Sequence, residues 1–110
     1  MVTIDVGKDF YFRLANRNKF QGDGKHTAVD FREKYLKELD SKEAWLNLDG
    51  FITFDFSGVR KIGPSFANEA FAYFMKYTNP ENFKKKVLFN NASEVQSMII
   101  DNELQSGYSK

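Results

Sequence analysis

The chain of 110 residues has no cysteine, one histidine and two prolines. Without cysteine it forms no disulfide and no thiolate metal site, and a lone histidine cannot build a histidine metal cluster. Sixteen basic and fifteen acidic residues leave a formal charge of +1, which gives no general attraction to nucleic acid or anionic membranes. The apolar runs are too short to span a bilayer. These absences favour a cytoplasmic domain.

Aromatic side chains are the abundant feature. Phenylalanine alone contributes 12 residues, and 42% of the chain is hydrophobic. Phenylalanine fills a core without adding a hydrogen-bonding atom, and this composition is typical of a globular protein. The length suits one core, so residues 1–110 are expected to form a single domain.

The patterning predicts alternating strands and helices. Period-two alternation over 2–6 and 10–14, on either side of Gly7, predicts an antiparallel hairpin. Residues 15–26 are polar and suit a loop. Thr27, with Asp30 three residues on, predicts the start of a helix that ends near residue 41. Residues 51–57 form the clearest strand, with an apolar and a polar face.

The second half continues in the same way. Pro64 fits the first position of a helix that runs to about residue 77. Asn79-Pro80 is expected to begin a loop, residues 86–90 a strand, and Ser93 with Gln96 the capping box of a last helix. Residues 105–110 are expected to fray. The predicted fold is therefore α/β, a mixed sheet of about four strands (ββαβαβα) with helices mainly on one face.

The candidate site is the passage from the 51–57 strand into the Pro64 helix. The unpaired N–H groups of a helix start lie at the positive end of the helix dipole, so a serine there is conspicuous. Ser65 could accept a phosphate or bind one, or its hydroxyl could cap its own helix. Asp55 could serve a site or bond to the loop, but a lone carboxylate lacks a partner for acid–base catalysis. The candidate partner-binding or regulatory residues are Asp55, Ser57, Gly58, Gly63, Pro64, Ser65, Asn68 and Glu69.

The run Phe-Asp-Phe-Ser-Gly-Val-Arg-Lys-Ile at 54–62, the order of elements and His26-Thr27-Ala28 resemble the STAS domain of sulphate transporters and anti-sigma-factor antagonists. The run Gly-Pro-Ser-Phe-Ala-Asn-Glu at 63–69 resembles a divergent branch, the STAS-like family of unknown function. In the antagonists, a histidine-kinase-like ATPase phosphorylates a serine at the start of the second helix and the phosphate breaks a protein complex. That serine aligns with Pro64 here, and Ser65 matches the second serine of the pattern.

The resemblance implies a non-catalytic regulatory module that binds a protein partner through residues 58–69. The expected partner is a histidine-kinase-like ATPase or a sigma-factor regulator, and Ser65 is the candidate phosphorylation site. No cofactor, metal, nucleic acid or membrane is expected to bind. The alternative is a sensor that holds a small phosphorylated ligand or a nucleotide at the same helix start.

Overall fold

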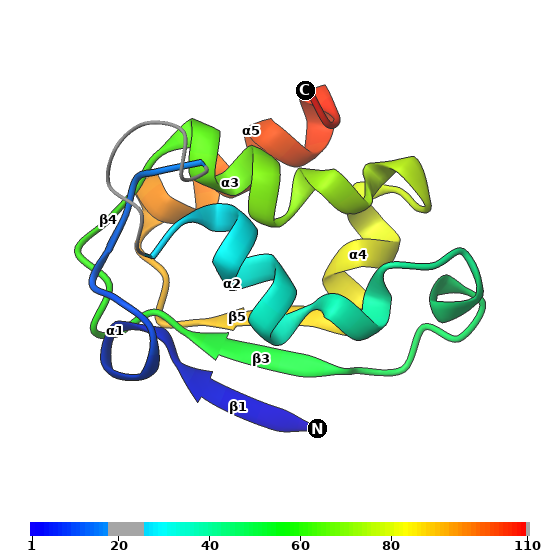
Figure 1. The fold of residues 1–110 in the computed structure, drawn as a ribbon, viewed down its shortest axis with the longest axis horizontal. Helices are drawn as coiled ribbons and strands as arrows, with labels where there is room; N and C mark the ends of the chain where they lie inside the picture. Colours follow the sequence, from blue (N-terminus) through cyan, green and yellow to red (C-terminus); the bar gives the residue numbers. More distant parts are fainter. Residues whose placement is uncertain (18–25, 110) are drawn as a thin grey trace.

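The structure is a computed structural model that describes residues 1–17 and 26–109. Most of the predicted loop over 15–26 therefore lies outside the described residues. Three parallel strands form the main sheet in the order β1-β3-β5, and a second parallel sheet pairs two short strands, β2 and β4. Figure 1 shows the helices gathered on one face of the main sheet. The predicted α/β class is confirmed. The strands are β1 (Val2–Asp5), β2 (Arg13–Leu14), β3 (Ile52–Asp55), β4 (Lys61–Ile62) and β5 (Val87–Asn90).

Three helices begin at the cap signals identified in the sequence. The Thr27 hydroxyl accepts from the Asp30 N–H at 3.1 Å, Pro64 is the first residue of its helix, and Ser93 with Gln96 forms the predicted capping box. Each of these signals is local, so sequence alone predicts it. The α-helices are α1 (Val6–Asp9), α2 (Ala28–Tyr35), α3 (Pro64–Ala70), α4 (Pro80–Lys86) and α5 (Glu94–Ser106), and the 3-10 turns are η2 (Lys37–Leu39), η3 (Glu43–Trp45) and η4 (Ala72–Lys76).

The predicted N-terminal hairpin is wrong. The Asp5 carboxylate caps the short helix α1 by accepting from the Lys8 N–H at 3.2 Å, so the chain turns away before the second apolar run. β1 then pairs with β3 and β2 with β4, both in parallel. A parallel pair requires a long crossover, which local alternation does not reveal.

Two further predictions need correction. Asn79-Pro80 does not begin a loop: the Asn79 side chain accepts from the Asn82 N–H at 2.9 Å and caps α4. The predicted strand over 86–90 begins one residue later, because Lys86 still belongs to the last turn of α4, where it is buried with its Nζ 2.8 Å from the Asn47 carbonyl.

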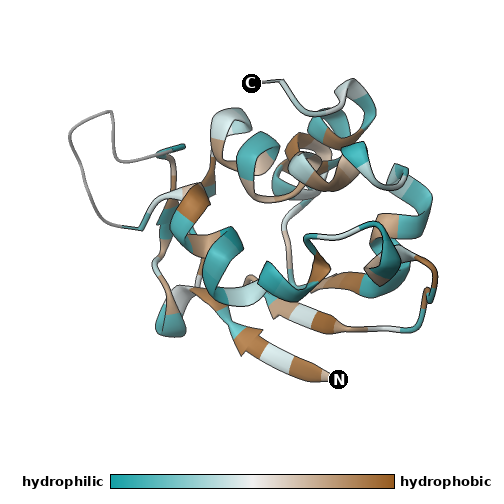
Figure 2. Ribbon diagram, turned by 45° about the vertical axis from the view of Figure 1, so that its right-hand side comes forward, coloured by the Kyte–Doolittle hydropathy of each residue, from teal (hydrophilic) through white to brown (hydrophobic). Residues whose placement is uncertain are grey.

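The core lies between the main sheet and the helices. Phe31, Phe54, Phe66, Phe71 and Phe83 are fully buried and meet largely edge to face. Figure 2 shows hydrophobic colour along the strands and hydrophilic colour on outer turns of the helices. In the part of the chain that the structure describes, no helix combines the length and apolar character needed to cross a membrane.

Candidate functional site

Asp55 shapes the turn that follows β3. Its Oδ1 accepts from the Asn91 side chain at 3.0 Å and from the Ser57 N–H at 2.9 Å. The hydrogen bond from Asn91 and those from Ser57 hold the pKa of Asp55 below its usual range. The carboxylate thus stays ionised and ties β3 to the residue after β5. Of the two interpretations made from sequence, these contacts support the loop-bonding one.

Two glycines allow the loop after β3 to contact the start of α1. A Cβ on Gly7 would lie 2.5 Å from the carbonyl carbon of Gly58, closer than any normal contact. The two backbones therefore meet with no room for a side chain between them. This contact fixes one end of the 57–65 loop against α1.

The 57–65 loop presents several exposed side chains. Ser57, Gly58, Pro64 and Ser65 are exposed, as are Arg60 and Lys61. Gly63 is the N-cap of α3, and no side chain caps this helix. The interpretation that the Ser65 hydroxyl caps its own helix is therefore wrong.

Basic side chains border this loop. Arg13 of β2 pairs in register with Lys61 of β4, and both are exposed. Partners in a parallel register point to the same side of the sheet, so the two cations lie together. The Arg60 N–H also donates to the Phe12 carbonyl at 2.8 Å, and Phe12 is partly exposed. The sequence alone does not reveal this basic surface, because no local signal indicates that residue 13 pairs with residue 61.

Asn68 does not lie on the exposed surface where it was expected. It is buried, and its side chain is fully hydrogen-bonded. Oδ1 accepts from Arg17 Nη2 at 2.7 Å and from the Ser109 N–H at 3.0 Å. Nδ2 donates to Glu103 Oε1 at 3.0 Å and to the Gly107 carbonyl at 2.9 Å. Asn68 thus holds the main chain of the segment that follows α5.

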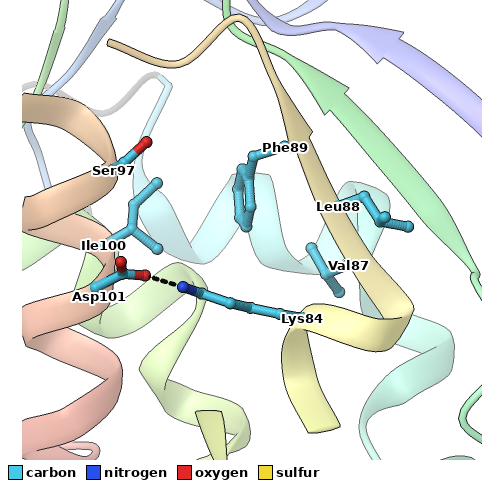
Figure 3. Close-up of a pocket in the computed structure, with 7 residues that line it drawn as sticks. All are labelled: Lys84, Val87, Leu88, Phe89, Ser97, Ile100 and Asp101. Atoms are coloured by element: carbon cyan, nitrogen blue, oxygen red, sulfur yellow. Dashed lines mark ion pairs between the residues drawn. The ribbon is translucent and has the colours of Figure 1, made fainter. Parts of the chain in front are cut away.

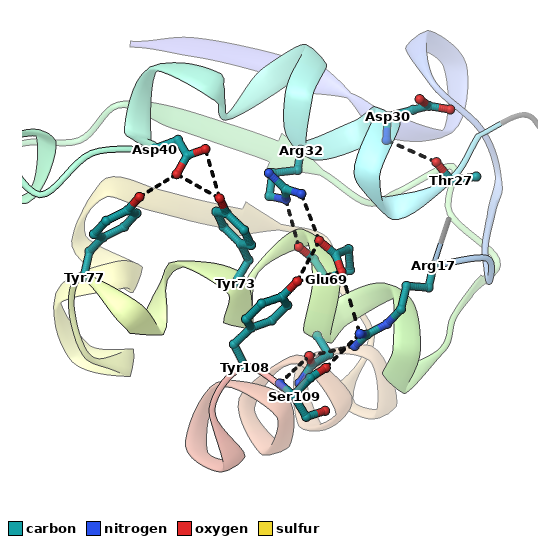
Figure 4. Close-up of polar contacts among 11 residues, drawn as sticks. Arg17, Thr27, Asp30, Arg32, Asp40, Glu69, Tyr73, Tyr77, Tyr108 and Ser109 are labelled. Atoms are coloured by element: carbon teal, nitrogen blue, oxygen red, sulfur yellow. Dashed lines mark hydrogen bonds and ion pairs between the residues drawn. The ribbon is translucent and has the colours of Figure 1, made fainter. Parts of the chain in front are cut away.

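Glu69 is also buried, between two arginines. Arg32 Nη2 lies 2.9 Å from Oε2 and Arg17 Nη1 lies 3.7 Å from Oε1, while the Tyr108 hydroxyl donates to Oε1 at 3.1 Å. Figure 4 shows these side chains converging from α2, α3 and the last segment. The partners of this carboxylate are internal, so Asn68 and Glu69 support the far side of α3 and are not part of its open start.

The same network extends to a second carboxylate. The Arg32 guanidinium stacks 3.7 Å from the centre of the Tyr73 ring, and the hydroxyls of Tyr73 and Tyr77 donate to Asp40 at 3.0 and 2.7 Å. Partial burial raises the pKa of Asp40, but the hydrogen bonds from Tyr77 and Tyr73 outweigh it and lower the value. Among residues 1–17 and 26–109, no group of three or more acidic or histidine side chains is placed to hold a metal ion.

The expectation that residues 105–110 fray is wrong for the residues described. Residues 105 and 106 end α5, and Gly107–Ser109 are fastened by Asn68, Glu69 and Arg17, whose Nη1 donates to the Ser109 carbonyl at 2.8 Å. We call Gly107–Ser109 the strap. Its partners are 39 to 92 residues away in sequence, so the local composition gives no sign of them.

Comparison with known proteins places the chain in a family. Residues 27–96 match the STAS-like domain of unknown function, DUF4325. The match covers well over half of the chain, which therefore belongs to this family, as the loop at 63–69 predicts. No curated protein and no solved structure matches the chain significantly.

Proposed function

We propose that this domain is a non-catalytic regulatory module that binds a protein partner through the 57–65 loop and the start of α3. The observation that carries the proposal is the state of Ser65. Its hydroxyl is exposed at the first turn of α3. Gly63 is the N-cap residue, so the Ser65 hydroxyl is not used to cap the helix. A hydroxyl placed in this way is accessible to a kinase and to a partner surface.

The charge of the loop supports an acidic partner surface. Arg60, Lys61 and Arg13 are exposed, and none of them forms an ion pair with a described residue. Exposed cations favour association with a surface of opposite charge and accelerate encounter at low salt. The family resemblance supports a histidine-kinase-like ATPase or a sigma-factor regulator as the partner class, and any ATP then belongs to the partner.

Phosphorylation of Ser65 would act through this charge. A phosphate adds about −1.5 to −2 charges. Next to Arg60 and Lys61 it would neutralise the cations that an acidic partner needs, and it would repel that partner directly. The helix dipole would favour the phosphate at this position, so modification would not unfold the start of α3. The result would be release of the partner.

The first test is mass spectrometry of the protein purified from its native host with any partner that accompanies it. Phosphate is expected on Ser65, and the unmodified form is expected to carry the partner. Ser65→Glu should release the partner, while Ser65→Ala should bind it and no longer respond to the kinase. Ser106→Ala, an exposed serine at the end of α5, is the matched control and should behave as wild type. Normal switching of Ser65→Ala would contradict the phosphoswitch.

Charge reversal tests the surface independently of phosphorylation. Arg60→Glu with Lys61→Glu should weaken partner binding by about tenfold or more. Raised salt should weaken wild-type binding and leave the variant less affected. Lys42→Glu with Lys37→Glu, also exposed, is the matched reversal elsewhere on the molecule. If the two double variants lose partner binding equally, the partner surface does not lie at Arg60 and Lys61.

A small phosphorylated ligand at this loop is the second candidate, because Arg13 and Lys61 lie together and would also bind an anion. A ligand that binds only the folded state raises the melting temperature. A thermal-shift series with inorganic phosphate and nucleotides separates the two candidates. A rise that Arg13→Ala abolishes, in a protein without a partner, would favour the sensor.

A further inference from the structure

Gln96 is a buried polar residue of α5 that is 7% exposed and contacts the 57–65 loop. Its Oε1 accepts from the Ser93 N–H at 2.8 Å, which completes the capping box of α5. Its Nε2 donates to the Val59 carbonyl at 3.0 Å. A capping box accepts glutamate as well as glutamine, because only an acceptor is needed there. The amide is therefore needed for the second contact, in which an ionised glutamate cannot donate.

The peptide group between Val59 and Arg60 is held at both ends. Its carbonyl accepts from Gln96, and its N–H, which belongs to Arg60, donates to the Phe12 carbonyl at 2.8 Å. A peptide group is planar, so hydrogen bonds at its two opposite ends fix the orientation of the plane. Arg60 and Lys61 follow this plane directly, and both are exposed. The contact with α5 therefore helps to set the direction in which these two cations leave the loop.

The helix that carries Gln96 is itself held by its neighbours. Figure 3 shows the buried Ile100 of α5 directed toward β5, and an ion pair between Asp101 of α5 and Lys84 of α4. The Asn68 side chain of α3 also donates to a carboxylate of α5 at 3.0 Å. Contacts thus reach α5 from α3, α4 and β5. Gln96 projects from a supported element, as a side chain that positions a loop requires.

We infer that Gln96 is a positioning residue of the proposed partner-binding surface. By holding the Val59 carbonyl, it fixes the peptide group from which the chain continues into Arg60 and Lys61. This role rests on the proposed function of the loop. A loop that is held in one orientation before binding loses less conformational freedom when a partner binds, so the affinity is higher. Gln96 acts without touching the partner, because its side chain is buried.

Two variants separate the contact with the loop from the capping of α5. Gln96→Glu keeps an acceptor for the Ser93 N–H and loses the donor to the Val59 carbonyl. Ser93→Ala is the matched control. It removes the hydroxyl that accepts from the Gln96 N–H at 3.1 Å, and it keeps the hydrogen bond between Gln96 Nε2 and Val59. Gln96→Met, which keeps the length of the side chain and loses both of its hydrogen bonds, is a second test variant.

The first measurement is hydrogen exchange of the Arg60 amide in the chain alone. Gln96→Glu and Gln96→Met should each accelerate this exchange by about tenfold or more relative to the amides of β3, because one end of the peptide group is released. Ser93→Ala should leave the relative rate unchanged. If neither Gln96 variant accelerates exchange of the Arg60 amide, the inference is overturned.

The second measurement is the affinity for the protein that co-purifies with wild type from the native host. Gln96→Glu should weaken binding by about tenfold. It should have no further effect in the double variant Arg60→Ala, Lys61→Ala, because the cations that Gln96 positions are then absent. A role in stability alone would weaken binding equally in both backgrounds, and that result would overturn the inference.

The failure of this inference differs from the failure of the proposed function. If no protein co-purifies, or if Arg60→Ala with Lys61→Ala leaves the affinity unchanged, the proposed function and the role of Gln96 are both overturned. If the double variant loses affinity and Gln96→Glu does not, only the role of Gln96 is overturned.

Discussion

At the scale of single residues, Asn68 is a buried polar side chain whose amide forms four hydrogen bonds in the described structure. A buried amide with two acceptor and two donor contacts specifies one position for each of its partners. Those partners come from the segment before α2, from α5 and from the strap. Ser65 lies one helical turn earlier, and its hydroxyl does not cap the helix. One face of α3 is therefore held by internal contacts, and its start is open to a partner.

Asn68→Ala should lower the free energy of unfolding by about 2–4 kcal/mol, because the substitution removes four hydrogen bonds and leaves buried groups unpaired. Urea denaturation measures the change. Asn102→Ala, on the exposed face of α5, is the matched control and should fall within about 0.5 kcal/mol of wild type. A loss no larger than the control's would mean that water replaces these contacts at little cost.

At the scale of elements, the starts of α2, α3 and α5 could be predicted from the sequence and the strand pairing could not. Thr27, Pro64 and Ser93 work through the next three residues, so a short window contains the cause. The pairing of Arg13 with Lys61 depends on where two distant segments fold, and the same holds for β1 beside β3. The Asn79 cap is also a local signal, but Asn-Pro is equally typical of the start of a loop, so the sequence alone predicts a loop there.

The same division applies to the candidate site. The exposed loop between β3 and α3 could be predicted, because a strand, a turn and a proline at a helix start follow one another in sequence. The burial of Asn68 and Glu69 could not, because their partners are Arg17, Arg32 and the strap. A hydrogen bond to a residue distant in the sequence does not change the local pattern of apolar and polar residues, so it cannot be predicted from that pattern.

The contact between Gly7 and Gly58 gives a prediction for elements. Gly7→Ala should lower the free energy of unfolding by about 2 kcal/mol or more, because the added carbon would overlap the Gly58 backbone and either α1 or the loop must move. Urea denaturation measures the change. Gly63→Ala is the control within the same loop. Its Cβ would meet only the Leu14 carbonyl at 3.9 Å, so the loss should stay near the roughly 1 kcal/mol of a changed N-cap. Equal effects would show that the glycine contact is easily relaxed.

At the scale of the whole molecule, the strap joins segments from both ends of the described chain. Arg17 donates to the Ser109 carbonyl, and the Tyr108 hydroxyl donates to Glu69. Glu69 also pairs with Arg32, which stacks on the ring of Tyr73, and the Tyr73 hydroxyl donates to Asp40. The polar network therefore connects α2, α3 and the end of α5 on the side of the helices remote from the sheet. Its integrity should depend on the protonation of Tyr108.

Burial, followed by the charge of Glu69, raises the pKa of Tyr108 above the ordinary tyrosine value of about 10. A raised folded-state pKa means that the stabilisation is complete below about pH 10 and is lost as pH rises through the folded-state value. Wild type should therefore be more stable than Tyr108→Phe by about 1 kcal/mol near neutrality, from the hydroxyl–carboxylate hydrogen bond. Above pH 10 the difference should shrink and then reverse, because only wild type acquires a tyrosinate beside Glu69. Urea denaturation of wild type and Tyr108→Phe across this range measures the crossing. A constant difference between wild type and Tyr108→Phe would mean that the strap detaches before Tyr108 ionises.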